Sequence, residues 1–145
     1  MAITTAMCST FKEQLLGGVH DLDTDTLKLA LIKASPSGTY GAATTNYSDV
    51  TGNSDEASGS GYSAGGGTLT SPVITLTGTT AFVDFADEAF TNVTVSADGC
   101  IIYNSSQSNK AIAVFDFGGT VSATSGTLTV QFPTNDASNA VIRLT

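Results

Sequence analysis

The chain has one histidine, so any serine or cysteine nucleophile activated by an imidazole would have to use it. This residue, His20, lies beside Asp21 in a polar stretch that precedes the first strand-like run. Neither feature distinguishes it from a histidine in an ordinary turn. The sequence therefore predicts no catalytic role for His20, and no catalytic residue elsewhere in the chain.

Three alternating aspartates follow the histidine and superficially resemble the start of a calcium-binding loop. With Asp21 as position 1 of such a loop, position 6 is Thr26 instead of glycine and position 12 is Ile32 instead of an acid. The EF-hand interpretation therefore fails, although a looser calcium site at Asp21, Asp23 and Asp25 stays open. We expect these side chains to accept backbone amides within the turn.

Four acidic residues lie in or beside strand-like runs, and two facing carboxylates could hydrolyse a glycosidic bond. They are Asp84, Asp87, Glu88 and Asp116. The chain has no tryptophan to form a sugar platform, and its phenylalanines alternate as core residues do. We therefore expect these acids to be structural. No glycine-rich sequence follows a strand and opens a helix, so no cofactor is predicted.

The two cysteines, Cys8 and Cys100, match no zinc or redox spacing. A zinc site would need further ligands, so no metal-binding residue is predicted. We expect two small, buried, apolar side chains. Whether the two pair in a disulfide stays open at this point.

The composition is that of an acidic chain with few charges. Ser and Thr make up 39 of the 145 residues, 12% of residues are charged, and the net charge is −8. Helical bundles need more Ala, Glu, Lys and Leu, and nucleic-acid binding needs basic clusters. No run approaches the roughly 20 apolar residues of a membrane span. The first residues lack the basic and apolar regions of a signal peptide, so a cytoplasmic origin is expected.

The chain is expected to begin with an N-terminal arm over residues 1–9, followed by a short helix over residues 10–17. Thr10 and Glu13 have the spacing of a capping box, which predicts the start of the helix. Gly17 and Gly18 are expected to end it, because glycine readily adopts the left-handed backbone conformation that a C-cap requires.

The alternating run 27–33 predicts a strand with one buried face. Residues 34–67 are rich in Ser and Gly, and their main aromatic side chains are Tyr40, Tyr47 and Tyr62. A loop of this length is uncommon in a compact domain unless it is functional. We therefore expect an extended segment that is either a surface excursion or an extension onto a neighbouring subunit.

From residue 68 onward the chain alternates with a period of two and is interrupted by turn signals every 8–12 residues. This pattern predicts one mainly β domain over residues 1–145, a sandwich or barrel of about 7–8 short antiparallel strands. Pro72 marks an edge or irregular stretch. The expected strands are 68–76, 80–85, 90–95, 100–104, 111–117, 126–132 and 140–144. The expected turns between them are 77–78, 98–99, 104–109, 118–119, 125–126 and 133–139.

Several stretches resemble a family of small virion structural proteins of tailed bacteriophages. They are LLGGVHDLDTDTLKLALI, SDEASGSGYSAGGGTLTSPVITLTG, AFVDFADEAFTNVTVSADGCIIYN and AIAVFDFGGTVSATSGTLTVQFP. The resemblance runs in order from Phe11 to Leu144. It implies a non-enzymatic protein that assembles on the outside of a capsid or along the tail. The first hypothesis is a protein that decorates and stabilises the capsid exterior through homo-oligomeric contacts, with copies of itself and the major capsid protein as partners. The implied location is the virion, assembled in the host cytoplasm, with neither nucleic acid nor membrane bound.

Two alternatives stay open. The first is a tail component, such as a tube, baseplate or fibre-base protein, which would contact other tail proteins. The second is a carbohydrate-binding adhesion module, because small β-sandwiches often bind glycans. The absence of tryptophan argues against that second alternative.

Overall fold

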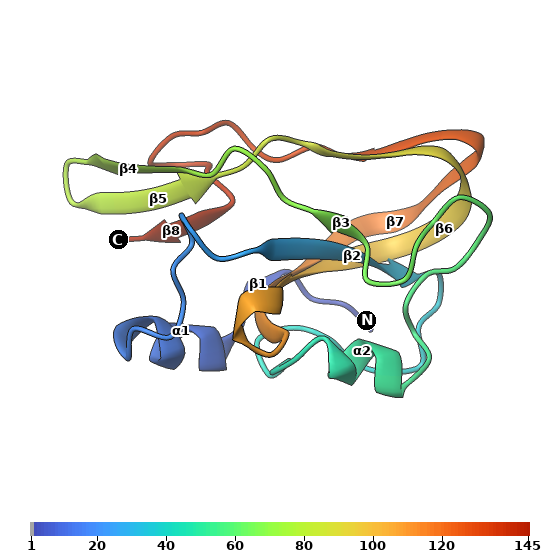
Figure 1. Ribbon diagram of the computed structural model, residues 1–145, viewed down its shortest axis with the longest axis horizontal. Coiled ribbons are helices and arrows are strands. Elements are labelled where there is room, and N and C mark those ends of the chain that lie inside the picture. The colour runs from blue at the N-terminus through green and yellow to red at the C-terminus, as the bar shows by residue number, and fades with distance from the viewer. Residues whose placement is uncertain (1) are drawn as a thin grey trace.

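The computed structural model describes residues 2–145, which form two antiparallel sheets with two short helices (Figure 1). The strand order is β1-β7-β6-β2-β3 in the larger sheet and β4-β5-β8 in the smaller. The mainly β prediction is confirmed, with 46% strand in a sandwich-like arrangement that is not a closed barrel. The strands are β1 (Ala6–Met7), β2 (Leu27–Lys33), β3 (Gly67–Thr68), β4 (Val73–Thr77), β5 (Thr80–Asp84), β6 (Glu88–Asn104), β7 (Lys110–Val130) and β8 (Ile142–Leu144).

Two long strands, β6 and β7, pair as an antiparallel ribbon in the larger sheet. The sequence predicted four short strands here, with turns at residues 98–99, 118–119 and 125–126, and those turns are wrong because both strands continue through them. A register shift adjoins Gly99, where an added Cβ would collide with the carbonyl oxygen of Phe115 in β7. Glycine here permits close backbone approach at a bulge, a role that sequence alone does not distinguish from a turn.

The predicted strand 68–76 is two strands in different sheets. β3 ends at Thr68, and the chain turns through Ser71, whose φ is 56°, before β4 begins at Val73. The expectation that Pro72 marks an edge or irregular stretch is confirmed, because β4 is an edge strand of the smaller sheet. Proline has no N–H to donate to a neighbouring strand, so it is tolerated just before an edge strand.

Helix α1 spans Ser9–Leu16 and begins one residue earlier than predicted. The capping box is wrong, because the N-cap residue is Cys8 and no side chain caps this helix. The backbone N–H of Cys8 donates to the carbonyl oxygen of Ile112 in β7 at 2.9 Å, which fixes where the chain leaves the sheet. Gly17 and Gly18 end the helix as predicted, and the left-handed conformation is at Gly18, with a φ of 73°, and not at Gly17, with a φ of −80°.

The described part of the N-terminal arm runs extended but lies against its own domain. β1 pairs with β7, and Ile3 is 3% exposed within the core. The N–H of Thr4 donates to the carbonyl oxygen of Tyr40 at 2.9 Å, and the N–H of Tyr40 donates to that of Ala2 at 2.7 Å. The arm therefore completes the fold, and it is not a free extension for contacts with neighbours.

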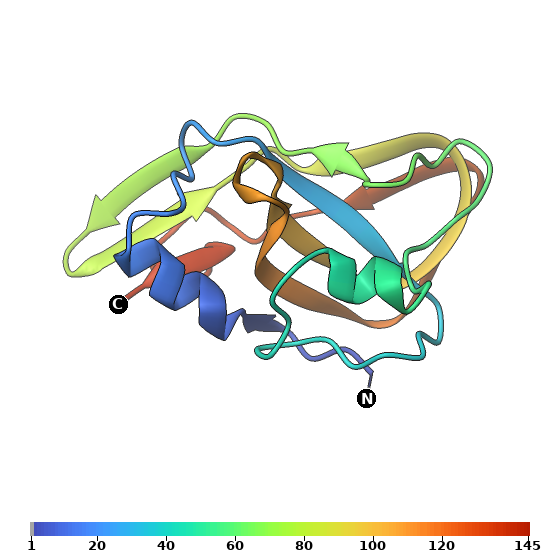
Figure 2. The ribbon, with the colours of Figure 1, turned by 60° about the horizontal axis from the view of Figure 1, so that its bottom comes forward.

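The long segment 34–67 also folds back on its own domain, and Figure 2 shows its helix α2 (Ser48–Gly52) lying over the larger sheet. Val50 is fully buried, and the N–H of Ala57 donates to the carbonyl oxygen of Leu31 at 2.8 Å. This covering buries β2 on both faces, so the prediction of a single buried face is wrong. Of the two expected alternatives, the segment is therefore a surface excursion and not an extension onto a neighbouring subunit.

The core is closed without a partner. It is built mainly on the larger sheet, where Leu29, Leu31, Ile101 and Ile112 are fully buried. The solvent-accessible area is 6871 Å², close to the roughly 6,900 Å² expected for a compact monomer of this mass. Single copies should therefore fold before any assembly takes place.

The smaller sheet forms one end of the molecule, and β4 is its outermost strand (Figures 1 and 2). β4 and β5 are joined by the two-residue turn Gly78-Thr79, with a φ of 60° at Gly78. Glycine suits the positive φ that such tight hairpins need. Facing residues on one side of the sheet form two apolar rows, Ile74–Val83–Ile142 and Leu76–Ala81–Leu144.

Candidate functional site

His20 is a buried structural residue. Its Nε2 lies 2.9 Å from Oε1 of Gln14, and its Nδ1 lies 3.0 Å from the side-chain amide nitrogen of Asn104. Because an amide nitrogen only donates, Nδ1 accepts and Nε2 carries the proton. Burial lowers the pKa of His20, although the nearby Asp25 raises it. Both ring nitrogens are engaged, and the ring packs on Phe11 with centroids 5.1 Å apart.

A Gly-x-Ser-x-Gly pattern at residues 61–65 is the sequence feature closest to a nucleophile motif. A nucleophile elbow requires a strand directly before the serine and a helix directly after it. Here Ser63 is exposed in a turn that has neither, and His20 is committed elsewhere. The pattern is therefore a loop, whose Gly61 and Gly65 have positive φ.

The alternating aspartates organise a turn, as predicted. Oδ1 of Asp21 accepts the N–H groups of Asp23 and Thr24 at 3.1 and 3.2 Å. Oδ2 of Asp25 accepts the N–H of Asp21 and the amide of Asn104. The side chain of Thr24 and then the two backbone amides lower the pKa of Asp21, and the N–H of Asp21 and the amide of Asn104 lower the pKa of Asp25. Among residues 2–145, no group of His, Cys, Asp and Glu is arranged to hold a metal ion.

Two of the four strand acids accept backbone N–H groups. Oδ1 of Asp116 accepts the N–H of Gly118, and Oδ1 of Asp87 accepts that of Phe132. Asp84 lies in the smaller sheet, where its buried Oδ1 has no hydrogen-bond partner within the described chain. Burial raises the pKa values of Asp84 and Glu88. Asp84 and Asp116 therefore belong to different sheets and different local contacts.

Both cysteines are buried free thiols, which answers the question of a disulfide. Burial raises the pKa of the Cys8 thiol to about 12, with a further contribution from Asp49. Burial also raises the pKa of Cys100 well above its ordinary value. Neither thiol can supply a reactive thiolate in the folded protein near neutral pH.

Asp55 anchors the 34–67 segment, a role that no sequence motif indicated. Its carboxylate is fully buried, pairs with Nζ of Lys33 at 2.9 Å, and accepts the hydroxyl of Tyr40 at 2.6 Å. It also accepts the N–H groups of Ser37 and Gly38 at 3.0 and 2.7 Å. Burial alone would raise the pKa of Asp55, but the hydrogen bonds hold it well below the ordinary value.

The neighbouring Glu56 engages the other tyrosines of the segment. It accepts the hydroxyls of Tyr47 and Tyr62, and its Oε1 accepts the N–H of Gly65 at 2.6 Å. Tyr47 also stacks on Tyr103, with ring centroids 4.4 Å apart. These rings hold the segment in place, so they do not form an open platform on which a sugar could stack.

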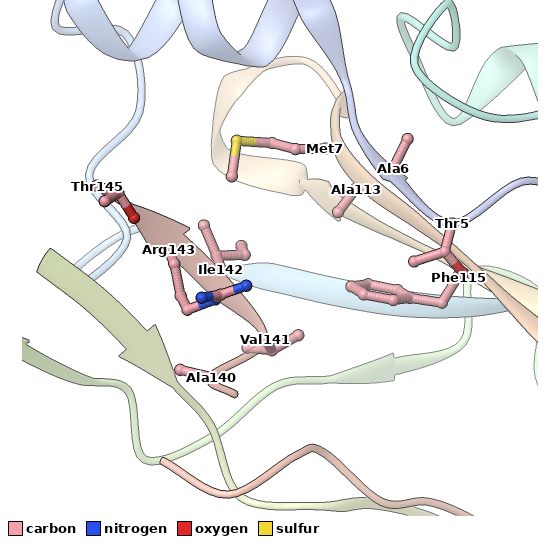
Figure 3. A pocket seen from close by; sticks show the side chains of 10 residues that line it. All are labelled: Thr5, Ala6, Met7, Ala113, Phe115, Ala140, Val141, Ile142, Arg143 and Thr145. Carbon is pink, nitrogen blue, oxygen red and sulfur yellow. The ribbon is translucent and has the colours of Figure 1, made fainter. Parts of the chain in front are cut away.

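A groove of about 260 Å³ runs between the N-terminal strand β1 and the C-terminal strand β8 (Figure 3). Small and apolar side chains dominate its lining, and the charged residue among those labelled in Figure 3 is Arg143. The guanidinium of Arg143 donates to the carbonyl oxygen of Ala137 at 3.3 Å. No nucleophile and base converge in this groove, so it has no evident catalytic machinery.

The most unusual surface lies on the apolar side of the smaller sheet. A second groove of about 150 Å³ there is lined by apolar residues alone. We call the groove lining together with Leu76 the apolar surface, whose most exposed members are Ile74, Leu76 and Leu144. The exposed fractions of these three are 54%, 71% and 46%. The groove lining is Leu15, Leu22, Ile74, Ala81, Phe82, Val83, Ile142 and Leu144.

The chain was compared with family models, curated proteins and solved structures, and none of them matches it. No helix in the described range is long and apolar enough to cross a membrane. What the chain does must therefore be inferred from its own residues and surfaces.

Proposed function

We propose that the chain is a non-enzymatic structural protein of a tailed-bacteriophage virion, which decorates and stabilises the capsid exterior through contacts between copies. The sequence resemblance from Phe11 to Leu144 motivates the virion role. The apolar surface is the observation that carries the proposal of assembly. Contiguous exposed apolar patches on small soluble proteins commonly mark interaction sites.

The composition of the apolar surface supports assembly over catalysis. Its groove is lined by apolar residues alone, while His20 and Asp55 are held in structural contacts. An apolar patch without a polar anchor suits a protein neighbour better than a small polar substrate, whose orientation requires placed polar groups.

The charge of the chain supports the same proposal. A net charge of −8 keeps free copies soluble and apart before assembly. The acidic side chains lie outside the apolar surface, whose named members are all uncharged. Copies can therefore meet a shell through this surface without burying an unpaired carboxylate.

Co-sedimentation with phage heads made without the chain tests this proposal. The wild-type protein should pellet with the heads, and Leu144→Lys should pellet substantially less because it places a charge on the apolar surface. Val121→Lys is the matched control, since Val121 is a 40% exposed apolar residue on β7 of the other sheet. Wild-type protein that stays in the supernatant at all concentrations would contradict the capsid proposal.

A further inference from the structure

The outer edge of β4 is open and unprotected. β4 stands at the end of the order β4-β5-β8, and no strand of the described chain pairs with its other side. Both ribbon views show it on the outside of the molecule (Figures 1 and 2). Monomeric proteins usually protect such an edge with lysine, a bulge or a covering loop. The sequence VITLT has no charge, and its pairing with β5 has no register shift.

The hairpin geometry determines which backbone groups face outward. The two-residue turn closes on the pair Thr77 and Thr80, and such a closing pair exchanges hydrogen bonds. Antiparallel pairs alternate between bonded and non-bonded, so Thr75 and Val73 also direct their backbone groups toward β5. The N–H and C=O groups of Ile74 and Leu76 therefore point away from the sheet.

We propose that a second copy of this chain pairs with β4, antiparallel and about a two-fold axis at Thr75. In this register Ile74 of each copy faces Leu76 of the other, and the outward backbone groups of both residues find partners. The two smaller sheets then join into one continuous sheet. Such a contact is isologous, with the same strand supplied by both copies.

The alternative registers are less favourable. An axis at Ile74 would place Pro72 opposite Leu76, and proline has no N–H to donate. An axis at Leu76 would place Gly78 opposite Ile74, although Gly78 belongs to the hairpin turn and has a φ of 60°. Thr75 is thus the position about which the strand complements itself.

The uncharged side chains around β4 suit a second copy of this chain as the partner. Ile74 and Leu76 lie on the apolar side of the sheet, so pairing brings the four side chains of two copies together across the axis. The run from Thr68 to Val83 contains no charged residue, although each copy carries a net charge of −8. Two acidic copies can therefore meet here without bringing carboxylates into contact.

The expected interface is small. A stable dimer buries roughly 800 Å² from each copy, and a five-residue edge strand provides only part of that. We therefore expect a concentration-dependent dimer with a dissociation constant in roughly the micromolar range or weaker. The biological use of the dimer rests on the proposed function, because closely spaced copies on a capsid would favour the pairing. The pairing itself does not depend on that function.

Sedimentation velocity over a range of concentrations tests the dimer. The wild-type protein should shift from the monomer to the dimer mass as concentration rises. Leu76→Lys should stay monomeric, because it places a lysine of each copy beside the axis, while Val121→Lys should behave as wild type. Unchanged circular dichroism melting would show that Leu76→Lys still folds, as expected for a side chain that is 71% exposed.

Cysteine cross-linking tests the register. Non-bonded antiparallel pairs have Cα atoms about 4.5 Å apart, which is within the range of a disulfide, so Thr75→Cys should form a covalent dimer on mild oxidation. Thr77→Cys is the control, because its two copies would lie on the order of 13 Å apart. The native cysteines are buried and should not interfere.

These results separate the pairing from the capsid role. A wild-type protein that stays monomeric at the highest attainable concentration would overturn the pairing, and equal cross-linking of Thr75→Cys and Thr77→Cys would overturn the register. Dimers that do not bind heads would leave the pairing supported and contradict the capsid proposal. A wild-type protein that binds heads but stays strictly monomeric would support the capsid proposal and overturn the pairing.

Discussion

The side-chain amide of Asn104 donates a hydrogen bond of 3.0 Å to Nδ1 of His20, 84 residues earlier in the chain. The same amide donates to Oδ2 of Asp25 at 2.7 Å. The end of β6 is thereby tied to the turn that precedes β2. The single histidine of the chain thus has a structural role, and its two ring nitrogens are not available for acid–base chemistry.

The buried histidine predicts a fall in stability as the solution is acidified. Burial lowers the pKa of His20 in the folded state, so the unfolded chain binds a proton more readily. Stability should therefore decrease as pH falls through about 6.5, the ordinary value, and the loss should level off below the folded pKa. Urea unfolding of the wild type and of His20→Gln at pH 7.5 and 5.5 measures this difference. An equal pH dependence in both proteins would contradict it.

Removal of the buried charge of Asp55, which anchors the 34–67 segment, should lower the stability of the protein strongly. Asp55→Asn removes the charge that Lys33, Tyr40 and two backbone amides contact. The free energy of unfolding should therefore fall by about 3 kcal/mol. Lys33→Gln should cost less than about 1 kcal/mol, because the lysine side chain is partly exposed. Equilibrium urea denaturation checks both values. Equal effects would show that the ion pair with Lys33, and not the amides and hydroxyl, holds the segment.

Substitutions in the N-terminal arm should lower the stability of the protein, whereas substitutions in a free extension would not. Ile3 is buried in the core, so Ile3→Ala should destabilise the protein by about 3 kcal/mol and Ile3→Val by about 1 kcal/mol. Thermal melting followed by circular dichroism provides the measurement. Two variants that melt like the wild type would mean that the arm does not pack as described.

The buried thiols predict slow reaction with thiol reagents in the native state. Burial raises the pKa of Cys8 to about 12 and that of Cys100 further, so little thiolate is present at pH 8 and access is blocked. A disulfide-forming chromogenic reagent should label neither cysteine in the folded protein and both in denaturant. Rapid labelling of one thiol under native conditions would reveal local opening around that residue.

The parts of the fold that sequence predicted well are those with local causes. Alternation at residues 27–33 indicated β2, and Gly17 indicated the end of α1. Glycine misled at 98–99 and 118–119, because the same residue serves turns and bulges, and only pairing with a neighbouring strand decides between them. The N-terminal arm gave no local sign of its burial, which depends on a contact with Tyr40 far along the chain.

The apolar surface was harder to predict than the strands. The sequence VITLT of β4 has the same alternation as a strand with one buried side. That sequence does not indicate that Ile74 and Leu76 are exposed. Exposure follows from the place of β4 at the edge of a separate three-stranded sheet. Pro72 was the one local sign of that edge. Asp55 likewise carried no motif, because its partners lie between Lys33 and Tyr40, well before it in the sequence.

Immunogold electron microscopy would show whether the chain lies on the outside of the capsid. An antibody raised against the purified chain would be applied to intact tailed-phage particles produced from the genome that encodes it. We predict gold particles distributed over the outside of the head. Label confined to the tail would support the tail alternative against capsid decoration, and particles without any label would contradict the virion role.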